Sequence, residues 1–195
     1  QITINPAGSL ASDTAYHVTI AASAFDDALS NSYAGISDAT TLNFVTLDTI
    51  DPTLSSSSPA DNATGVGINA NIVLTFSEAV DVESGNITIK KSSDNSTIET
   101  IAVGSTKVSG SGSNAITINP AATLLNSTGY YVLIDASAFD DPSSNSYVGI
   151  SGTTMLNYTT EADTTNPTLS SSSPIDGATG VGFDELIILT FSEVV

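Results

Sequence analysis

The chain has 195 residues, 40% of them hydrophobic, which is enough apolar material for a core and excludes a globally disordered protein. Its formal net charge of −18, from 21 acidic residues against three lysines, excludes nucleic acid and anionic membranes as partners because both require a basic surface. The sequence has no cysteine and no apolar run long enough to span a bilayer, so we expect neither disulfides, thiolate metal sites nor membrane insertion.

Several motifs occur twice, in the same order and at nearly constant spacing. ITINP, AFDD and SY-x-GIS recur 114 residues apart, whereas DT-x-x-PTLSSSSP and TFSE recur 115 apart. The paired positions are 2–6 and 116–120, 24–27 and 138–141, 32–37 and 146–151, 48–59 and 163–174, and 75–78 and 190–193. This pattern predicts a section of a tandem array. We assign residues 1–47 to the C-terminal part of one Ig-like repeat, 48–162 to a complete repeat and 163–195 to the N-terminal part of the next.

Within the complete repeat, short stretches of alternating apolar and polar residues predict about seven strands. They are an edge strand TLSSSS at 53–58, NIVLTFS at 71–77, NITIKK at 86–91, TIETIAV at 97–103, AITINP at 115–120, GYYVLIDA at 129–136 and MLNYTT at 155–160. In TIETIAV the alternation is less regular, since Ile98 and Ile101 fall out of phase. ASAFDD at 136–141 suits a single helical turn. The pattern predicts an all-β fold of tandem immunoglobulin-like β-sandwiches with Greek-key connections.

The order of these motifs resembles a known family. The stretch PADNATGVG, followed by an apolar strand ending in TFSE, an ITINP strand and a YYV strand, is similar to the bacterial SbsA-type Ig-like domain of S-layer proteins and large repetitive adhesins. The resemblance implies an extracellular or cell-surface β-sandwich module without catalytic residues. From the tandem pattern we expect the partners to be neighbouring repeats of the same array or filament, or further copies of the chain in a homopolymer.

The junctions between repeats carry carboxylates that suit a hard cation. Asp48 and Asp51 precede the complete repeat, and Asp163 opens the next junction, where Asn166 replaces the second aspartate. Together with carboxylates of a neighbouring domain they would supply oxygen ligands for calcium. The alternative is an ordinary Asx turn before proline. Both interpretations remain open from the sequence.

A second acidic motif lies in the AFDD loop of each copy. Asp26 and Asp27 recur as Asp140 and Asp141, and an asparagine follows each pair four residues after its second aspartate. These oxygens form a second calcium candidate, although the spacing is not that of an EF-hand. The alternative is a turn in which the side chains cap backbone N–H groups.

The remaining polar residues give no catalytic constellation. Glu78 and Glu193 end the TFSE strands, and we expect an exposed strand end there. The single histidine, His17, stands where the other copy has Tyr131, which indicates a strand surface. A lone histidine without a nucleophile and an orienting acid does not predict a triad, so we expect no enzyme.

We therefore expect a structural extracellular module whose tandem repeats form a semi-rigid rod or filament of a bacterial surface adhesin or S-layer-like protein. The alternative is a glycan-binding Ig-like module, for which Tyr33 and Tyr147 are the best stacking candidates. Each of these tyrosines also suits a loop anchor that packs on the sandwich. The sequence leaves open whether the partial repeats are completed within one chain or between chains.

Overall fold

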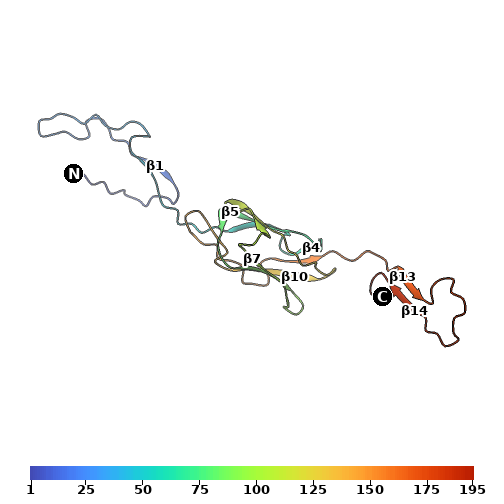
Figure 1. Cartoon of the computed structure of the whole chain (residues 1–195). Coiled ribbons are helices and arrows are strands. Elements are labelled where there is room, and N and C mark those ends of the chain that lie inside the picture. Colours follow the sequence, from blue (N-terminus) through green and yellow to red (C-terminus); the bar gives the residue numbers. More distant parts are fainter. The chain divides into compact units, whose positions relative to one another are not determined.

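A computed structural model describes residues 1–195 and shows an all-β chain (Figure 1). It divides into two compact units, Gln1–Glu161 and Ala162–Val195. No helix long and apolar enough to cross a bilayer occurs in it. The predicted all-β class is confirmed.

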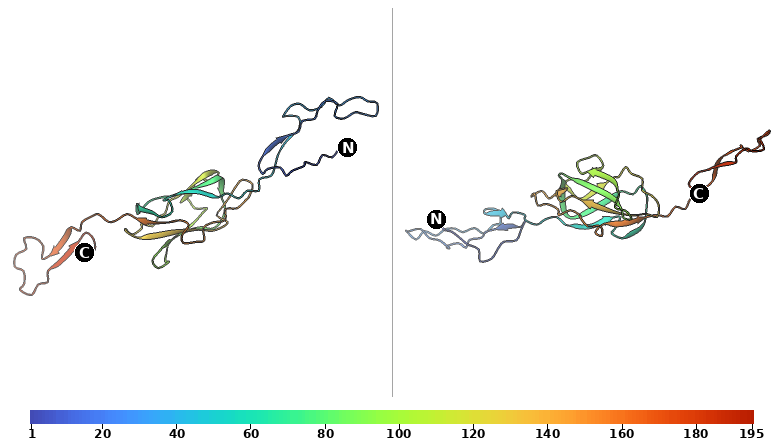
Figure 2. Two further views of the ribbon diagram at one scale, coloured as in Figure 1. Left: turned by 180° about the vertical axis from the view of Figure 1, so that it is seen from behind. Right: turned by 90° about the horizontal axis from the view of Figure 1, so that it is seen from below.

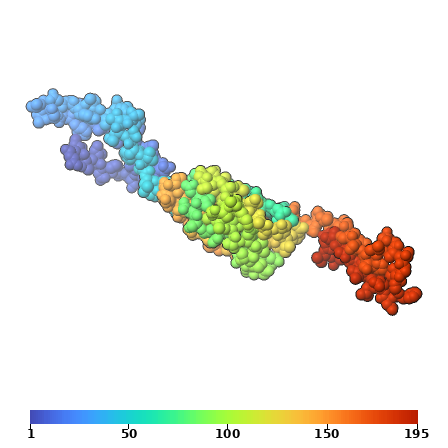
Figure 3. All heavy atoms as spheres, viewed as in Figure 1, coloured from blue at the N-terminus to red at the C-terminus, as the bar shows by residue number.

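Residues 48–161 form a two-sheet sandwich, whose atoms make one compact body from turquoise to orange in Figure 3. One sheet has the order β4-β12-β10-β6-β7, and the other has the order β11-β5-β9-β8 with β3 paired to β5. The strands are β3 (Leu54–Ser58), β4 (Ala63–Val66), β5 (Ile72–Val82), β6 (Asn86–Lys91), β7 (Thr97–Ala102), β8 (Val108–Ser109), β9 (Ser113–Ile118), β10 (Gly129–Ile134), β11 (Phe139–Asp140) and β12 (Asn157–Thr160).

The core lies between the two sheets and follows the predicted alternation. Ile72, Leu74 and Phe76 of β5 are at most 2% exposed. They form one buried cluster with the isoleucines of β9, beside them in the same sheet, and with those of β6 in the opposite sheet. At one end of the core, the Phe76 ring lies 5.4 Å from Phe139 and 5.1 Å, edge-on, from Tyr147. Such aromatic pairs contribute about 0.5–1.5 kcal/mol each beyond their burial.

The irregular strand β7 owes its pattern to a bulge. Ile89 pairs with Glu99 and Lys90 pairs with Thr97, so Ile98 is an extra residue without a partner on β6. A bulge shifts the alternation by one position. Ile98 and Ile101 therefore both contact the core, although they are out of phase in the sequence. The phase break in the sequence therefore reflects a real irregularity of the strand.

The predicted helical turn at 136–141 is wrong. The chain makes a turn there and then forms β11, in which Phe139 pairs with Val82 and Asp140 with Asp81 at the end of β5. Phe139 is fully buried. Burial of this ring through strand pairing outweighs the weak local preference for a helical turn.

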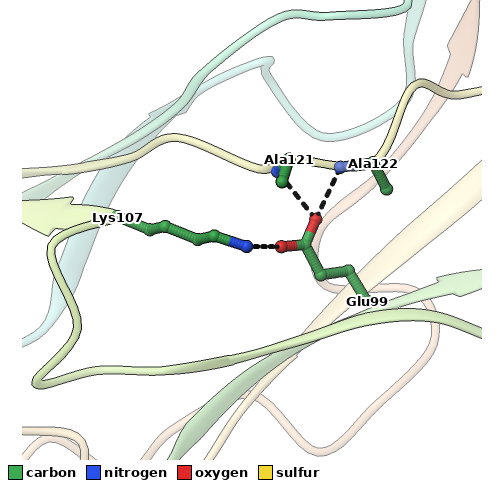
Figure 4. Close-up of polar contacts among 4 residues, drawn as sticks. All are labelled: Glu99, Lys107, Ala121 and Ala122. Carbon is green, nitrogen blue, oxygen red and sulfur yellow. Dashed lines mark hydrogen bonds and ion pairs between the residues drawn. The ribbon is translucent and has the colours of Figure 1, made fainter.

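A half-buried carboxylate joins the two sheets of the sandwich (Figure 4). Glu99 of β7 forms an ion pair with Lys107, and its second oxygen accepts hydrogen bonds from the backbone N–H groups of Ala121 and Ala122, both at 2.9 Å. Burial acts to raise the pKa of Glu99, but Lys107 and the two N–H groups outweigh it and leave the pKa lowered. The segment after β9 is thereby fixed to β7 of the opposite sheet.

The chain enters and leaves the sandwich at opposite ends. β3 pairs with β5 so that Leu54 lies beside Phe76 and Ser58 beside Val73. β12 runs parallel to β4 and ends with Thr160 beside Val66, near the start of β5. The first strand therefore begins beside Phe76, in the middle of β5, and runs toward the start of β5, near which the last strand finishes.

Residues 1–47 and 163–195 carry much less regular structure (Figure 2). In the first segment β1 (Ala15–His17) pairs antiparallel with β2 (Asn43–Val45). In the second unit β13 (Leu169–Ser173) pairs antiparallel with β14 (Ile188–Phe191). Both segments leave large apolar side chains exposed.

Candidate junction site

The junction aspartates cap local turns. The Asp48 carboxylate accepts hydrogen bonds from Ile50 N at 3.0 Å and from the Ser12 hydroxyl at 3.1 Å. At the second junction, Asp163 accepts a hydrogen bond from Thr165 N at 2.9 Å. Asp51, the other predicted ligand of the first junction, is exposed. The Asx-turn alternative thus describes the local structure at both junctions.

The AFDD loops form the same cap in both copies. Asp141 Oδ1 accepts from the backbone N–H groups of Ser143 and Asn145, and its Oδ2 accepts from the Asn145 side-chain amide, all at 2.8 Å. Asp27 makes the equivalent three bonds to Leu29 and Asn31. The turn interpretation therefore holds for the second aspartate of each pair.

The first aspartate of each pair, Asp140 or Asp26, takes no part in these loop caps. Asp140 is part of β11, opposite Asp81, and its Oδ1 is buried without a hydrogen-bond partner. Asp26 pairs with Ser32 across its own exposed loop. Neither side chain joins the carboxylate group described next.

Three carboxylates meet where the junction reaches the sandwich. Asp48 of the junction, Glu78 of β5 and Asp141 of the AFDD loop each offer an oxygen within 4.8 Å of the other two. The structure thus brings together one member from each predicted calcium set. Asp51, Asp163, Asp26, Asp27 and Asp140 are not members of this group.

Glu78 is the member that the sequence interpretation missed. Instead of the exposed strand end that we expected, Glu78 is half-buried, because β5 continues past it to Val82. Its neighbour Ser77 donates from its backbone N to Thr53 O at 2.8 Å. The pairing of β3 with β5 therefore places Glu78 beside the junction, which directly precedes β3.

The electrostatics of the group oppose its full ionisation. Burial, followed by the charges of Asp141, Asp48 and Asp13, raises the pKa of Glu78. Burial also acts to raise the pKa of Asp141, but hydrogen bonds from Asn145 and the loop backbone hold it below its ordinary value. The pKa values of Glu78 and Asp141 are therefore shifted in opposite directions, and Glu78 holds a proton more readily than Asp141.

The donor set suits a hard cation. Calcium binds six to eight oxygen ligands, and carboxylate oxygens are prominent among them. Asp48, Glu78 and Asp141 would supply part of such a shell, with the rest from backbone carbonyls or water. Calcium binding here stays a prediction.

The two candidate sugar-stacking tyrosines differ in position. Tyr147 is 3% exposed and packs edge-on against Phe76, so it is a loop anchor and presents no ring to solvent. Tyr33 is 43% exposed and lies 6.4 Å from Phe25. His17, expected on a strand surface, lies exposed on β1.

The sandwich, its topology and its repeated loop caps define an immunoglobulin-like module. A family model described as a bacterial Ig-like domain matches residues 48–160, so the chain belongs to that family and the predicted resemblance is confirmed. No curated protein matches the chain. The division at residues 48 and 163 into partial and complete repeats stays a prediction.

Among solved structures, the chain is similar to the crystal structure of the S-layer protein rSbsC(31-844). The TM-score is 0.40 at 16% sequence identity, with 63% of this chain covered. The chain spans 16% of the length of that protein.

Proposed function

We propose that this chain is a structural spacer of a bacterial surface protein, in which Ig-like repeats follow one another as a semi-rigid rod or filament. The observation that carries this proposal is the path of the chain through residues 48–161. It enters beside Phe76 and leaves beside Val66, at opposite ends of the sandwich. Modules with this path extend a chain when they are joined in series.

The junction supports limited bending. Thr49 N donates to the Ser12 hydroxyl at 2.8 Å, and Asp48 accepts from the same hydroxyl, so the end of the preceding segment is held to the junction. Pro52 is buried within the repeat that follows. A short connection with a fixed proline and side-chain bonds restricts the hinge between neighbouring repeats.

An extracellular location and a role in an adhesin or S-layer-like assembly are part of the proposal. Membership of the bacterial Ig-like family supports a surface module. The net charge of −18 is compatible with an exposed, well-solvated polypeptide. The partners would be neighbouring repeats, and no enzymatic activity is expected.

Two experiments test the spacer role. Negative-stain images of the protein should show beads of equal size along a line, whereas compact globules would contradict a rod. Antibodies raised against this chain should label intact bacterial cells. Labelling only after the cells are permeabilised would overturn the surface location.

A further inference from the structure

The chain contains two Asp-Pro bonds, and their aspartates lie in different surroundings. Asp51–Pro52 is in the junction before β3, and Asp141–Pro142 is in the AFDD loop. An Asp-Pro bond is the peptide bond that dilute acid cleaves most readily. The aspartate carboxyl group can attack its own carbonyl carbon as a nucleophile, and the prolyl nitrogen of this tertiary amide is readily protonated as it leaves. Cleavage therefore depends on whether the carboxyl group is free to reach that carbon.

The Asp51 carboxyl group is free to make this attack. Its side chain is exposed, and no hydrogen bond holds it. The residues that follow are fixed, because Pro52 is buried and Thr53 N donates to the Ser77 hydroxyl of β5 at 3.0 Å. The leaving nitrogen is thus attached to the sandwich, whereas the attacking group can rotate in water.

The Asp141 carboxyl group is bound through both of its oxygens. Oδ1 accepts hydrogen bonds from the backbone N–H groups of Ser143 and Asn145, and Oδ2 accepts one from the Asn145 side-chain amide. The carbonyl oxygen of Asp141 accepts another from Ser144 N at 3.0 Å. Asp141 is 3% exposed, so attack on its own carbonyl carbon requires the loop to open first.

We propose that Asp51–Pro52 is a self-cleavage site, at which acid separates the sandwich from the segment before it. A side-chain oxygen of Asp51 forms a C–O bond to the Asp51 carbonyl carbon and closes a five-membered cyclic anhydride. The C–N bond to Pro52 breaks, and its electron pair stays on the prolyl nitrogen, which takes a proton from the acidic solution. Water then opens the anhydride and leaves the two carboxyl groups of a C-terminal Asp51.

The position of this bond keeps the repeat whole after cleavage. β3 begins at Leu54, three residues after Asp51, so every strand from β3 to β12 stays on one fragment. The hydrogen bonds of Ser12 with Asp48 and Thr49 stay on the other fragment. Acid therefore cuts the connection without removing a strand. This inference does not depend on the spacer role.

The second junction contains a natural control. Asn166 precedes Pro167 at the position equivalent to Asp51, and its side chain is also exposed. A neutral amide is a poorer nucleophile than a carboxylate, so we expect the bond between Asn166 and Pro167 to survive in acid. The chain thus places a free aspartate, a bound aspartate and a free asparagine before proline.

Mass spectrometry of the full chain after incubation in acid tests the proposal. The pH is the lowest at which the circular dichroism of the folded chain is unchanged. The folded chain should yield fragments 1–51 and 52–195, with cleavage after Asp141 slower by about tenfold or more because the loop must open. In urea at the same pH both Asp-Pro bonds should be cut at similar rates, since no fold then holds Asp141.

Variants at the two junctions exchange their behaviour. Asp51→Asn should abolish the first cut, and Asn166→Asp should add a cut after residue 166. Asp51→Glu keeps the negative charge but requires a six-membered ring, so it should slow the cleavage. Both positions are exposed, and an unchanged melting temperature serves as the folding control.

Either of two results would overturn the proposal. One is equal cleavage of the two Asp-Pro bonds in the folded chain, which would show that the hydrogen bonds of Asp141 give no protection. The other is an Asp51–Pro52 bond that survives in the folded chain and is cut only in urea. That result would show that the junction restrains Asp51 as firmly as the loop restrains Asp141.

Discussion

Two regions of this molecule share a sequence and differ in structure. ITINP at 116–120 contributes to β9, whose isoleucines are fully buried, whereas ITINP at 2–6 forms no strand and leaves Ile2 and Ile4 more than half exposed. The five residues are identical, so their local preferences are identical. The difference is the partner strand β5, which covers one copy only. Strand formation here depends on pairing far along the chain rather than on local sequence.

Other features are the same in both regions. The Tyr130 hydroxyl accepts from Leu125 N at 3.0 Å, and the Tyr16 hydroxyl accepts from Ala11 N at 2.9 Å. The capped AFDD loop is also repeated bond for bond. Contacts that span about five residues are therefore encoded locally, whereas burial is encoded by the whole repeat.

The largest expected effect comes from removing a core side chain in one copy only. Ile118→Ala should lower the free energy of unfolding by about 2–5 kcal/mol, because it leaves a cavity between the sheets. Ile4→Ala, the same change in the exposed copy, should stay within about 0.5 kcal/mol. Urea unfolding of the full chain followed by tyrosine fluorescence measures both, and equal effects would show that Ile4 is also buried in solution.

Comparing alanine substitutions at Gly149 and Gly65 distinguishes the effect of a steric clash from the effect of an unfavourable backbone conformation. Its φ is +76°, and a Cβ atom there would lie 2.4 Å from Ile134 O. We expect Gly149→Ala to destabilise the sandwich by about 1–3 kcal/mol. Gly65, with φ +69° and open space around it, is the control, since Gly65→Ala has the conformational strain without the collision. Thermal melts of the two variants should differ, and equal melts would contradict the collision.

The loop cap should matter more where it is buried. Asp141→Ala leaves the N–H groups of Ser143 and Asn145 without their acceptor, which should cost about 1–3 kcal/mol in the free energy of unfolding. Asp27→Ala removes the same bonds from an exposed loop, where water replaces the carboxylate, so no measurable change in global stability is expected. Chemical denaturation compares the pair, and a larger effect for Asp27 would invert the comparison.

Calcium should stabilise the repeat that contains the carboxylate group. At ten times its dissociation constant, an ion that binds only the folded state adds about 1.4 kcal/mol. The melting temperature should rise with added calcium and return to its starting value with EDTA, and Glu78→Gln should weaken the response. Asp163→Asn is a control outside the group. An EDTA-insensitive melting temperature would refute the calcium prediction.

The smallest effect concerns pH. The pKa of Glu78 is raised in the folded state, so folding is favoured when Glu78 is protonated and this contribution is lost as the pH rises through that pKa. Without calcium, Glu78→Gln should therefore be more stable than the unmodified chain at neutral pH, by less than about 1 kcal/mol. The difference should shrink as the pH is lowered. Unfolding curves of both proteins from neutral to acidic pH measure this stability difference. A difference that grows as the pH falls would show that the pKa of Glu78 is lowered in the folded state.

Much of the fold could be predicted because alternation reports which residues face the core. The strands predicted at 71–77, 86–91, 115–120 and 129–136 are all present, although β5 continues five residues further, to Val82, and β9 begins two residues earlier. The bulge at Ile98 and the short strand at Phe139 could not be specified, since both follow from register between strands. For the same reason the sequence did not group Glu78 with Asp48 and Asp141. Along the chain, Glu78 is 30 residues and Asp141 is 93 residues from Asp48.

The parallel pairing of β12 with β4 has a mechanical consequence. Tension on the two ends of the repeat pulls these neighbouring strands along their length in opposite directions, so their hydrogen bonds, such as Asn62 N to Asn157 O and Glu161 N to Val66 O, carry the load in shear. Bonds loaded in shear must break together, whereas those of a hairpin pulled from its open end break one at a time. The repeat is thus built to resist stretching where its last strand, β12, pairs with β4, the strand that follows the entering strand β3.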